Sequence, residues 1–244
     1  QLSAVSTLRQ TQVQSVLTSL ENDINTVTGN AVTSKGMSFL INGTKDSPLY
    51  QSNDELVRTQ LEIVQQGNAQ YDEILLLNNN GNVVIATLKT NENLDFSQRP
   101  FFQRALSGFT FTIEQDFPGS SDISILITRP VLENGTVQGY LAARTHFDAI
   151  AAIIETQTGL ENTLETYMVG KDLVPLTNTQ GSALRVSTVA TEQTIVEGQT
   201  GSGRYANYAS TDVLGYYAWM PEIEVALITE IDQVEVIQGI LTLL

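Results

Sequence analysis

The chain has 244 residues and 41% of them are hydrophobic, which is enough to bury one large domain or two modest ones. Twelve basic residues against 27 acidic ones give a net charge of −15, which repels nucleic-acid phosphates and anionic lipids, so we expect no nucleic-acid partner. The absence of cysteine excludes disulfides and cysteine metal sites, and no run approaches the roughly 20 apolar residues of a membrane-spanning helix.

The first thirty residues are predicted to form one long amphipathic helix. They contain no proline, and no glycine before Gly29. Their apolar residues recur at three- and four-residue steps, at Val13, Val16, Leu17, Leu20, Ile24 and Val27. The polar face is rich in Gln, Ser, Thr and Asn, so its helix propensity is moderate. Packing against a partner surface must therefore supply much of the stability of this helix.

A second helix is predicted to begin after Ser52. Glu55 follows Ser52 by three residues, which is the spacing of a capping box, and apolar residues up to Val64 then fall on one face. The sequence between the two helices, residues 29–50, is predicted to be an irregular connection.

The pattern then changes from helices to strands. Alternating apolar residues and turn residues predict five strands, at residues 73–77, 83–86, 109–113, 123–128 and 137–146. The first two form a hairpin through the turn Asn78-Asn79-Asn80-Gly81. A short helix is predicted between Pro100 and Gly108, and Asp148 is placed to cap a helix that follows the fifth strand.

The remainder of the chain predicts a second, smaller sheet and a final helix. Its strands are expected at residues 166–169, 173–176, 204–209, 213–219 and 224–230. A loose stretch separates the first two from the others up to residue 200. Residues 231–244 carry apolar side chains at helical spacing. Helices at both ends of two antiparallel sheets define an α+β fold.

Three stretches of this sequence carry a pattern whose order is informative. In the first, strand residues 74–77 and an Asn-Gly turn precede Asp95-Phe96-Ser97-Gln98-Arg99-Pro100-Phe101-Phe102. In the second, Thr128-Arg129-Pro130-Val131 ends a strand and Gly139-Tyr140-Leu141 opens the next. The third runs from Tyr205 through Gly215-Tyr216-Tyr217-Ala218-Trp219 to Asp232. Their order and spacing resemble the double Cache sensor family of bacterial and archaeal histidine kinases and chemoreceptors.

The resemblance implies a long N-terminal helix packed along two PAS-like antiparallel sheet units, and a C-terminal helix that leads to the membrane. Residues 1–70 would hold the N-terminal helices, residues 71–165 the membrane-distal ligand-binding unit and residues 166–231 the membrane-proximal unit. Residues 232–244 would form the C-terminal helix.

The same resemblance implies an extracytoplasmic sensor of a transmembrane histidine kinase or chemoreceptor. Its partners would be a small-molecule ligand in the distal unit, the membrane through flanking helices, and a second copy in the full-length receptor. The piece itself is then expected to be neither an enzyme nor a holder of a cofactor. Two alternatives stay open, a surface or adhesion module without a small ligand and a carboxylate-based hydrolase, because acidic residues are plentiful although none lies in a motif.

The predicted ligand-binding residues come from the helix after Arg99 and from the third to fifth strands. They are Arg99, Phe101, Phe102, Thr112, Ser124, Thr128, Tyr140, Ala142 and Arg144. Strand alternation places Tyr140, Ala142 and Arg144 on one face of the fifth strand, and the small Ala142 leaves room above the sheet. Of the adjacent pair Phe101 and Phe102, we expect one in the core and one against the ligand.

Arg144 decides which ligands are expected. In amino-acid-binding members of the family, an acidic residue at the position of Arg144 holds the ammonium group, a tryptophan stands where this chain has Phe101, and a tyrosine where it has Leu94. Amino-acid sensing is therefore disfavoured, and Arg144 with Arg99 would suit a carboxylate or other anion. The alternative is that Arg144 pairs with Glu114 or Asp116, and Arg99 with Asp95.

Other candidate motifs favour ordinary structural roles. His146 is the single histidine, so a metal site or a catalytic triad lacks partners. The glycines of residues 198–203 are not followed by Lys-Ser or Lys-Thr and are not a phosphate loop. Asn42 and Asn134 each begin an Asn-Gly-Thr sequon, for which a turn is the favoured interpretation.

Overall fold

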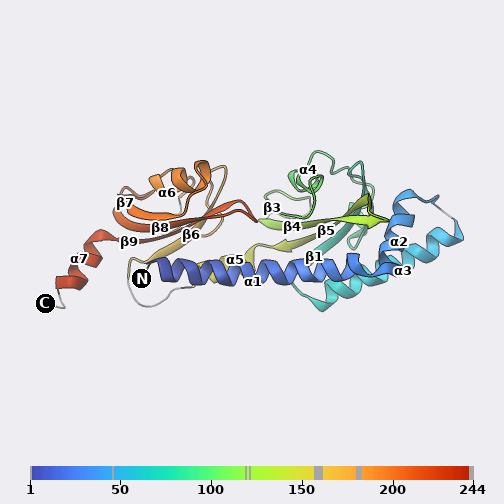
Figure 1. Ribbon diagram of the computed structural model, residues 1–244, viewed down its shortest axis with the longest axis horizontal. Coiled ribbons are helices and arrows are strands. Elements are labelled where there is room, and N and C mark those ends of the chain that lie inside the picture. Colours follow the sequence, from blue (N-terminus) through green and yellow to red (C-terminus); the bar gives the residue numbers. More distant parts are fainter. Residues whose placement is uncertain are drawn as a thin grey trace. The chain divides into compact units, whose positions relative to one another are not determined.

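The computed structural model describes residues 2–45, 47–118, 120, 122–156, 162–179 and 183–241. It is an α+β protein with two antiparallel sheets, as predicted (Figure 1). The chain forms two compact units. Residues 17–147 form the first sheet unit, and residues 1–16 together with 148–244 form the second sheet unit.

Helix α1, Leu2–Gly29, confirms the predicted N-terminal helix and contributes residues to both units. In the first sheet unit, Leu17, Leu20 and Ile24 are buried, and the Tyr71 hydroxyl donates a hydrogen bond to the Leu20 carbonyl oxygen at 3.3 Å. In the second sheet unit, Arg9 donates from Nη2 to the carbonyl oxygen of Thr156. The weakly helical sequence of α1 is thus stabilised by tertiary contacts in each unit.

The first sheet has the strand order β2-β1-β5-β4-β3 and every pairing is antiparallel. Its strands are β1 Tyr71–Asn78, β2 Val83–Ala86, β3 Thr110–Glu114, β4 Ser124–Glu133 and β5 Thr136–His146. Asn134 and Gly135, both at positive φ, make the tight turn between β4 and β5, which confirms the turn interpretation of that sequon. The 3-10 turn η1, Lys89–Asn91, follows β2.

The two faces of this sheet carry different side chains. Because residues paired across antiparallel strands share a face, Thr112, Leu126 and Arg144 lie on one side. Ile113, Ile125 and the other alternate residues lie on the opposite side. Figure 1 shows α4, Pro100–Ala105, on one side of the sheet and α1 on the other. We call the side under α4 the polar face.

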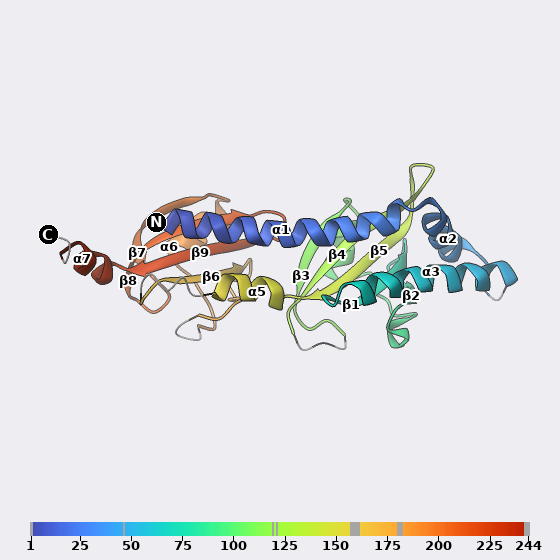
Figure 2. The same ribbon diagram turned by 90° about the horizontal axis from the view of Figure 1, so that it is seen from below.

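Helices α2, Ala31–Asn42, and α3, Pro48–Gly67, correct the sequence prediction. The stretch 29–50 was expected to be irregular, yet Asn30 caps α2 and the Ser47 side chain caps α3, five residues before the predicted cap at Ser52. Gly36 looks like a helix breaker, but a Cβ there would lie 3.0 Å from Val57 Cγ2. Close packing of α2 on α3, which Figure 2 shows side by side, therefore requires glycine at this position.

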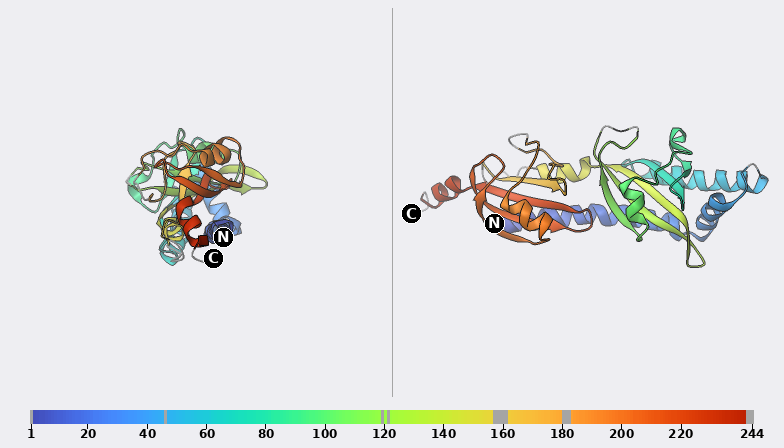
Figure 3. Two further views of the ribbon diagram at one scale, coloured as in Figure 1. Left: turned by 90° about the vertical axis from the view of Figure 1, so that its left-hand side faces the viewer. Right: turned by 90° about the horizontal axis from the view of Figure 1, so that it is seen from above.

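The second sheet has the strand order β6-β9-β8-β7, with every pairing antiparallel. The strands are β6 Glu165–Gly170, β7 Gly201–Ala206, β8 Asp212–Met220 and β9 Val225–Asp232. Its helical elements are α5 Asp148–Glu155, α6 Val189–Thr191, the π-helical turn η2 Glu192–Val196, and α7 Gln233–Leu241. The strand predicted at 173–176 is only an isolated bridge between Val169 and Pro175. Figure 3 shows α6 over β7 and β8.

Among the described residues, no helix combines the length and the apolar character that a membrane span requires.

Gly139 provides a test of the register of β1 and β5. A Cβ at Gly139 would lie 2.3 Å from the carbonyl oxygen of Leu77, which belongs to the backbone of the neighbouring strand. We expect Gly139→Ala to lower the free energy of unfolding by about 1–3 kcal/mol, since the strands must separate to admit the methyl group. Chemical denaturation measures this change.

The matched control is Gly203→Ala in β7, where an added Cβ meets no atom within 4 Å. We expect its unfolding free energy to equal that of the wild type within about 0.5 kcal/mol. Equal denaturation midpoints for the two variants would contradict the register described for β1 and β5.

Candidate functional site

A β-bulge at the start of β1 places two carboxylates on the polar face. Tyr71 pairs with Thr145 and Glu73 pairs with Arg144, so β1 has one more residue than β5 in this interval. The extra residue, Asp72, is thereby free to leave the alternation of the strand. Its carboxylate reaches Arg144 and His146, at 3.1 Å and 2.5 Å.

Arg144 is the most deeply placed cation of this face, with 5% of the residue exposed. Its Nη1 donates to Oδ2 of Asp72 at 3.1 Å, and its Nε lies 3.7 Å from Oε2 of Glu73. The guanidinium carbon lies 5.2 Å from the centre of the Phe117 ring. The sequence alternative had expected Glu114 or Asp116 as the partner of Arg144, and the structure shows the two acids of β1 instead.

Glu73 is fully buried and is held by two neighbours. Asn91 Nδ2 lies 2.9 Å from each oxygen of its carboxylate, and Arg144 approaches from the other side. Burial raises the pKa of Glu73, although the Asn91 hydrogen bond and the Arg144 charge oppose this effect. Glu73 is therefore easier to protonate than an exposed glutamate.

Arg99 forms a separate ion pair at the start of α4. Its Nε and Nη2 donate to Oε2 of Glu114 at 3.0 Å and 2.6 Å. The other carboxylate oxygen of Glu114 accepts the Phe101 backbone N–H at 2.9 Å. The expected partner, Asp95, instead accepts the Ser97 backbone N–H at 2.8 Å. Glu114 thus anchors both the side chain before α4 and the first turn of the helix.

Several buried polar atoms on this face have no hydrogen-bond partner among the described residues. They are Oγ1 of Thr110, Thr112 and Thr128, Nε of Arg144 and Nδ1 of His146. Ser124 makes only a long contact, 3.5 Å from its hydroxyl to the carbonyl oxygen of Asp122. A buried hydroxyl without a partner costs about 1–3 kcal/mol, so these groups favour a ligand that supplies hydrogen bonds.

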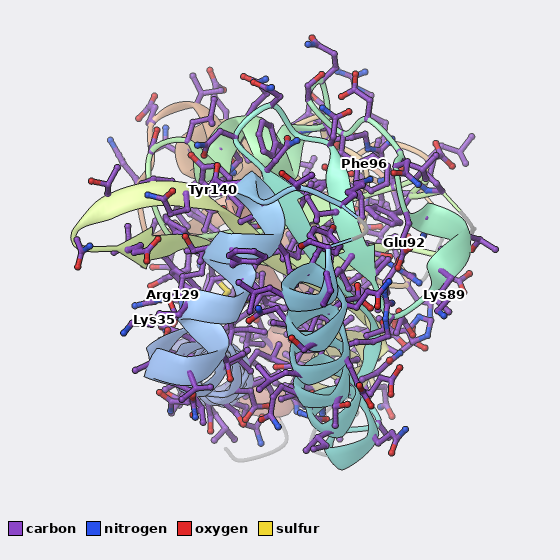
Figure 4. The ribbon with its side chains drawn as sticks, turned by 90° about the vertical axis from the view of Figure 1, so that its right-hand side faces the viewer. Lys35, Lys89, Glu92, Phe96, Arg129 and Tyr140 are labelled. Carbon is purple, nitrogen blue, oxygen red and sulfur yellow. The ribbon has the colours of Figure 1, made fainter. Side chains whose placement is uncertain are left out.

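Aromatic residues cover the rest of the polar face. Phe96, Phe101 and Phe117 form one cluster with ring centres 5.4–6.2 Å apart. Phe102 packs edge-on against Tyr140, with ring centres 5.3 Å apart. Figure 4 shows Phe96 and Tyr140 on the side of the sheet away from α2 and α3. Both Phe101 and Phe102 are buried in this apolar layer, together with Ala142.

The structure therefore brings the predicted residues together at one face and adds four that the sequence argument missed. The additions are Asp72, Glu73, Asn91 and Phe117, whereas Glu114 was expected only as a partner of Arg144. Glu73 and Glu114 could have been recognised from the sequence, because each is an acid on a predicted strand. The neighbours of such an acid are either apolar or on the same face as predicted site residues. Among the described residues, no group of three or more His, Cys, Asp or Glu side chains is arranged to hold a metal ion.

A family model of the Cache domain, dCache_1, matches residues 2–240. The chain belongs to this family. Cache domains of this kind are extracytoplasmic sensor domains of membrane receptors, which agrees with the sequence resemblance. None of the curated proteins matches the chain significantly.

Solved structures show the same fold at low sequence identity. The sensor domain of the Vibrio cholerae histidine kinase DctB superimposes with a TM-score of 0.70 at 11% identity, covering 95% of each chain. The ligand-binding domain of the Pseudomonas aeruginosa PAO1 amino acid chemoreceptor PctC, in complex with GABA, gives 0.62 at 16% identity, covering 95% of this chain and 98% of PctC.

The ligand-binding domain of the Campylobacter jejuni chemoreceptor Tlp3, in complex with L-norvaline, gives a TM-score of 0.64 at 15% identity. It covers 94% of this Cache domain and 88% of the Tlp3 chain. These similarities establish the double Cache fold, with its two sheet units, for the present chain.

The Arg99–Glu114 pair predicts how the polar face depends on charge. Glu114→Ala leaves the Phe101 N–H without its acceptor. The guanidinium of Arg99, whose side chain is 28% exposed, can instead be hydrated. We expect the free energy of unfolding to fall by about 3 kcal/mol, the lower end of the range for a broken buried pair. Glu114→Gln keeps an acceptor and should lose less.

Glu62→Ala, on the exposed side of α3, is the control for removing an acid and should leave the unfolding free energy unchanged. Urea denaturation of the four proteins measures the difference. If Glu114→Ala were as stable as Glu62→Ala, the ion pair would not anchor α4.

Proposed function

We propose that this Cache domain is the ligand-sensing part of a transmembrane histidine kinase or chemoreceptor, and that a small molecule binds to the polar face of the first sheet unit. This unit would be the membrane-distal one. The observation that carries the proposal is the set of buried, unpartnered polar atoms around Arg144, Thr112 and Thr128. A folded protein retains such unsatisfied groups where a ligand completes them.

We propose a carboxylate as the ligand's recognised group. The hydroxyls of Thr112 and Thr128 are donors on one face without acceptors, and Arg144 Nε makes only the 3.7 Å contact with Glu73. The paired positions Thr112, Leu126 and Arg144 lie side by side across β3, β4 and β5. Arg99 lies at the edge of this region, beside Glu114. A charged donor with two neutral ones suits a carboxylate, which accepts several hydrogen bonds.

The acids beside Arg144 restrict which carboxylates bind. Asp72 and Glu73 compensate its charge, so a bare anion meets less attraction than an unpaired arginine would provide. A ligand that also carries a donor group gains from the same acids. This feature supports reconsidering amino acids, because the acid that β5 lacks is supplied here by β1, and PctC and Tlp3 are described with amino-acid ligands.

Signalling in the proposed receptor requires a ligand to favour one of two conformations. Ligand can shift the equilibrium only by its unequal affinity for the two states. In the proposed full-length receptor, flanking membrane helices and a second copy of the chain complete the signalling unit. Helix displacements of about 1–2 Å are large enough to transmit the signal.

Calorimetry of small carboxylates, with and without an amino group, tests the proposal. We expect Arg144→Ala to weaken binding by roughly ten- to a hundredfold, which corresponds to one charged hydrogen-bonding group. Because this change leaves Asp72 and Glu73 without their cation, the melting temperature is measured first. Arg144→Lys keeps the charge but loses the planar fork, and should bind with intermediate affinity.

The control is Arg129→Ala, which removes an arginine from the opposite side of β4, where its guanidinium lies 5.7 Å from the Phe109 ring centre. Its affinity should equal that of the wild type. Unchanged affinity in a folded Arg144→Ala protein would overturn the carboxylate proposal. A ligand found only among residues 166–230 would overturn the assignment to the first sheet unit.

The raised pKa of Glu73 predicts the pH dependence of binding. As pH falls through that pKa, Glu73 becomes neutral and compensates less of the Arg144 charge. Carboxylate affinity should therefore increase as the pH is lowered through the raised pKa of Glu73, as long as the pH stays above the ordinary carboxylate pKa of about 4, so that the ligand remains ionised. In Glu73→Gln this dependence should vanish, and a retained dependence would assign it to another group.

A further inference from the structure

The second sheet unit contains a row of residues that joins an open sheet edge to buried acids. Gly203 of β7 pairs with Gly215 of β8, Gly215 pairs with Glu230 of β9, and Glu230 pairs with Glu165 of β6. Paired residues in antiparallel strands share a face of the sheet. The two glycines, which have no side chains, and the two glutamates therefore lie in one row on the same face.

Tyr205 lies across this row because Gly215 has no side chain. A Cβ at Gly215 would be 2.0 Å from the Tyr205 hydroxyl oxygen, so any other residue would displace the ring. At Gly203, two residues from Tyr205 along the edge strand β7, an added Cβ meets no atom within 4 Å. The ring of Tyr205 therefore separates Glu230 from open space above the edge of the sheet.

Glu230 is buried without a cation. The residue is 1% exposed, and its Oε1 accepts the Tyr167 hydroxyl at 2.9 Å. The Tyr205 hydroxyl is a further, weaker donor to Glu230, whose Oε2 accepts no well-formed hydrogen bond, and no lysine or arginine of the described residues forms an ion pair with Glu230. Burial raises the pKa of Glu230 to about 7, and the Glu165 charge acts in the same direction while the Tyr205 and Tyr167 hydroxyls oppose it.

Three tyrosine hydroxyls lie at the two carboxylates, and a fourth ring, Tyr217, packs beside Tyr205. Tyr167 and Tyr208 meet edge to face with centres 5.5 Å apart, and Tyr205 and Tyr217 with centres 6.4 Å apart. The Tyr208 hydroxyl donates to Glu165, 2.9 Å and 2.7 Å from its two oxygens. Aromatic faces attract cations, and a buried carboxylate is stabilised by one, so this enclosure has the composition of an ammonium site.

We propose that the second sheet unit binds a small organic ammonium ion, which pairs with Oε2 of Glu230 among Tyr167, Tyr205, Tyr208 and Tyr217. The ligand reaches Glu230 from the sheet edge at Gly203 when Tyr205 turns toward the open space there. This site differs from the polar face of the first sheet unit in position, in charge and in ligand class, so either can exist without the other.

A panel of ammonium salts with a neutral control tests the proposal. The full Cache domain is titrated by calorimetry and thermal shift with methylammonium, tetramethylammonium and choline chlorides, with sodium chloride at equal ionic strength as reference. The neutral isostere of choline, 3,3-dimethyl-1-butanol, has the same shape without the charge. We expect at least one ammonium ion to raise the melting temperature, and the neutral alcohol and sodium chloride to have no effect.

Two variants in the second sheet unit locate the site. Glu230→Gln keeps the size and hydrogen bonding of the protonated acid and should weaken binding at least about tenfold. Gly203→Val fills the open space beside Tyr205 and should also weaken binding, while the absence of nearby atoms keeps the fold intact. Arg129→Ala, on the opposite side of β4 in the first sheet unit, should leave ammonium binding unchanged.

The pH profile separates a binding site from a buried acid with a structural role. Wild-type affinity for the ammonium ion should rise as pH increases through about 7, since Glu230 must ionise to bind it, whereas the weak binding to Glu230→Gln should not. Two results would overturn the proposal: no ammonium salt raises the melting temperature more than sodium chloride does, even if stability depends on pH, or the shifts in Glu230→Gln and wild type are equal.

Discussion

The constraint with the widest consequences in this Cache domain is that charges buried on a sheet face must be neutralised nearby. Arg144, at 5% exposure, is tolerable only because Asp72 and Glu73 lie beside it. Asp72 is available because β1 bulges by one residue opposite β5. The bulge, the ion pairs and the unpartnered hydroxyls of β3 and β4 are therefore parts of one arrangement, and the ligand chemistry of the unit follows from it.

The two sheet units stabilise their buried carboxylates by different groups. In the first, acids are compensated by arginines, as in Glu114 with Arg99. In the second, Glu230 relies on the Tyr167 hydroxyl, which stabilises a carboxylate less than a cation does. Ion pairs suit recognition of a ligand with donors and acceptors, whereas tyrosines around an acid suit a cation.

A sensor must also respond to its ligand, and the positions of the acids indicate how. Glu114 holds Arg99 and the first turn of α4 at once, so a ligand that competes for Arg99 would alter the contact that places α4. The Phe101–Phe117 contact links α4 to the same face, with ring centres 6.2 Å apart. A ligand bound as proposed would therefore be coupled to the position of α4 through shared residues, which is the physical requirement for population shift.

Much of the secondary structure was predictable from the sequence, because the period of apolar residues is a local property. The apolar face of α1 from Val13 to Val27 and the alternation of apolar and polar residues in β3 and β4 can each be seen in one contiguous segment. Family membership followed from the order of three such stretches. By contrast, α2 was missed, and the contact that suits its glycine, between Gly36 and Val57, involves another helix and is not visible in the local sequence.

For the site, the sequence determined which side chains share the polar face, since strand alternation needs no knowledge of neighbours. Thr112, Ser124, Thr128, Tyr140 and Arg144 were assigned to it on that basis. The partners of the two arginines were decided only by the tertiary structure. Asp72 is 72 residues from Arg144, and a one-residue bulge directs it there. Register and burial determine the strength of an ion pair, and neither is a property of the residues that form it.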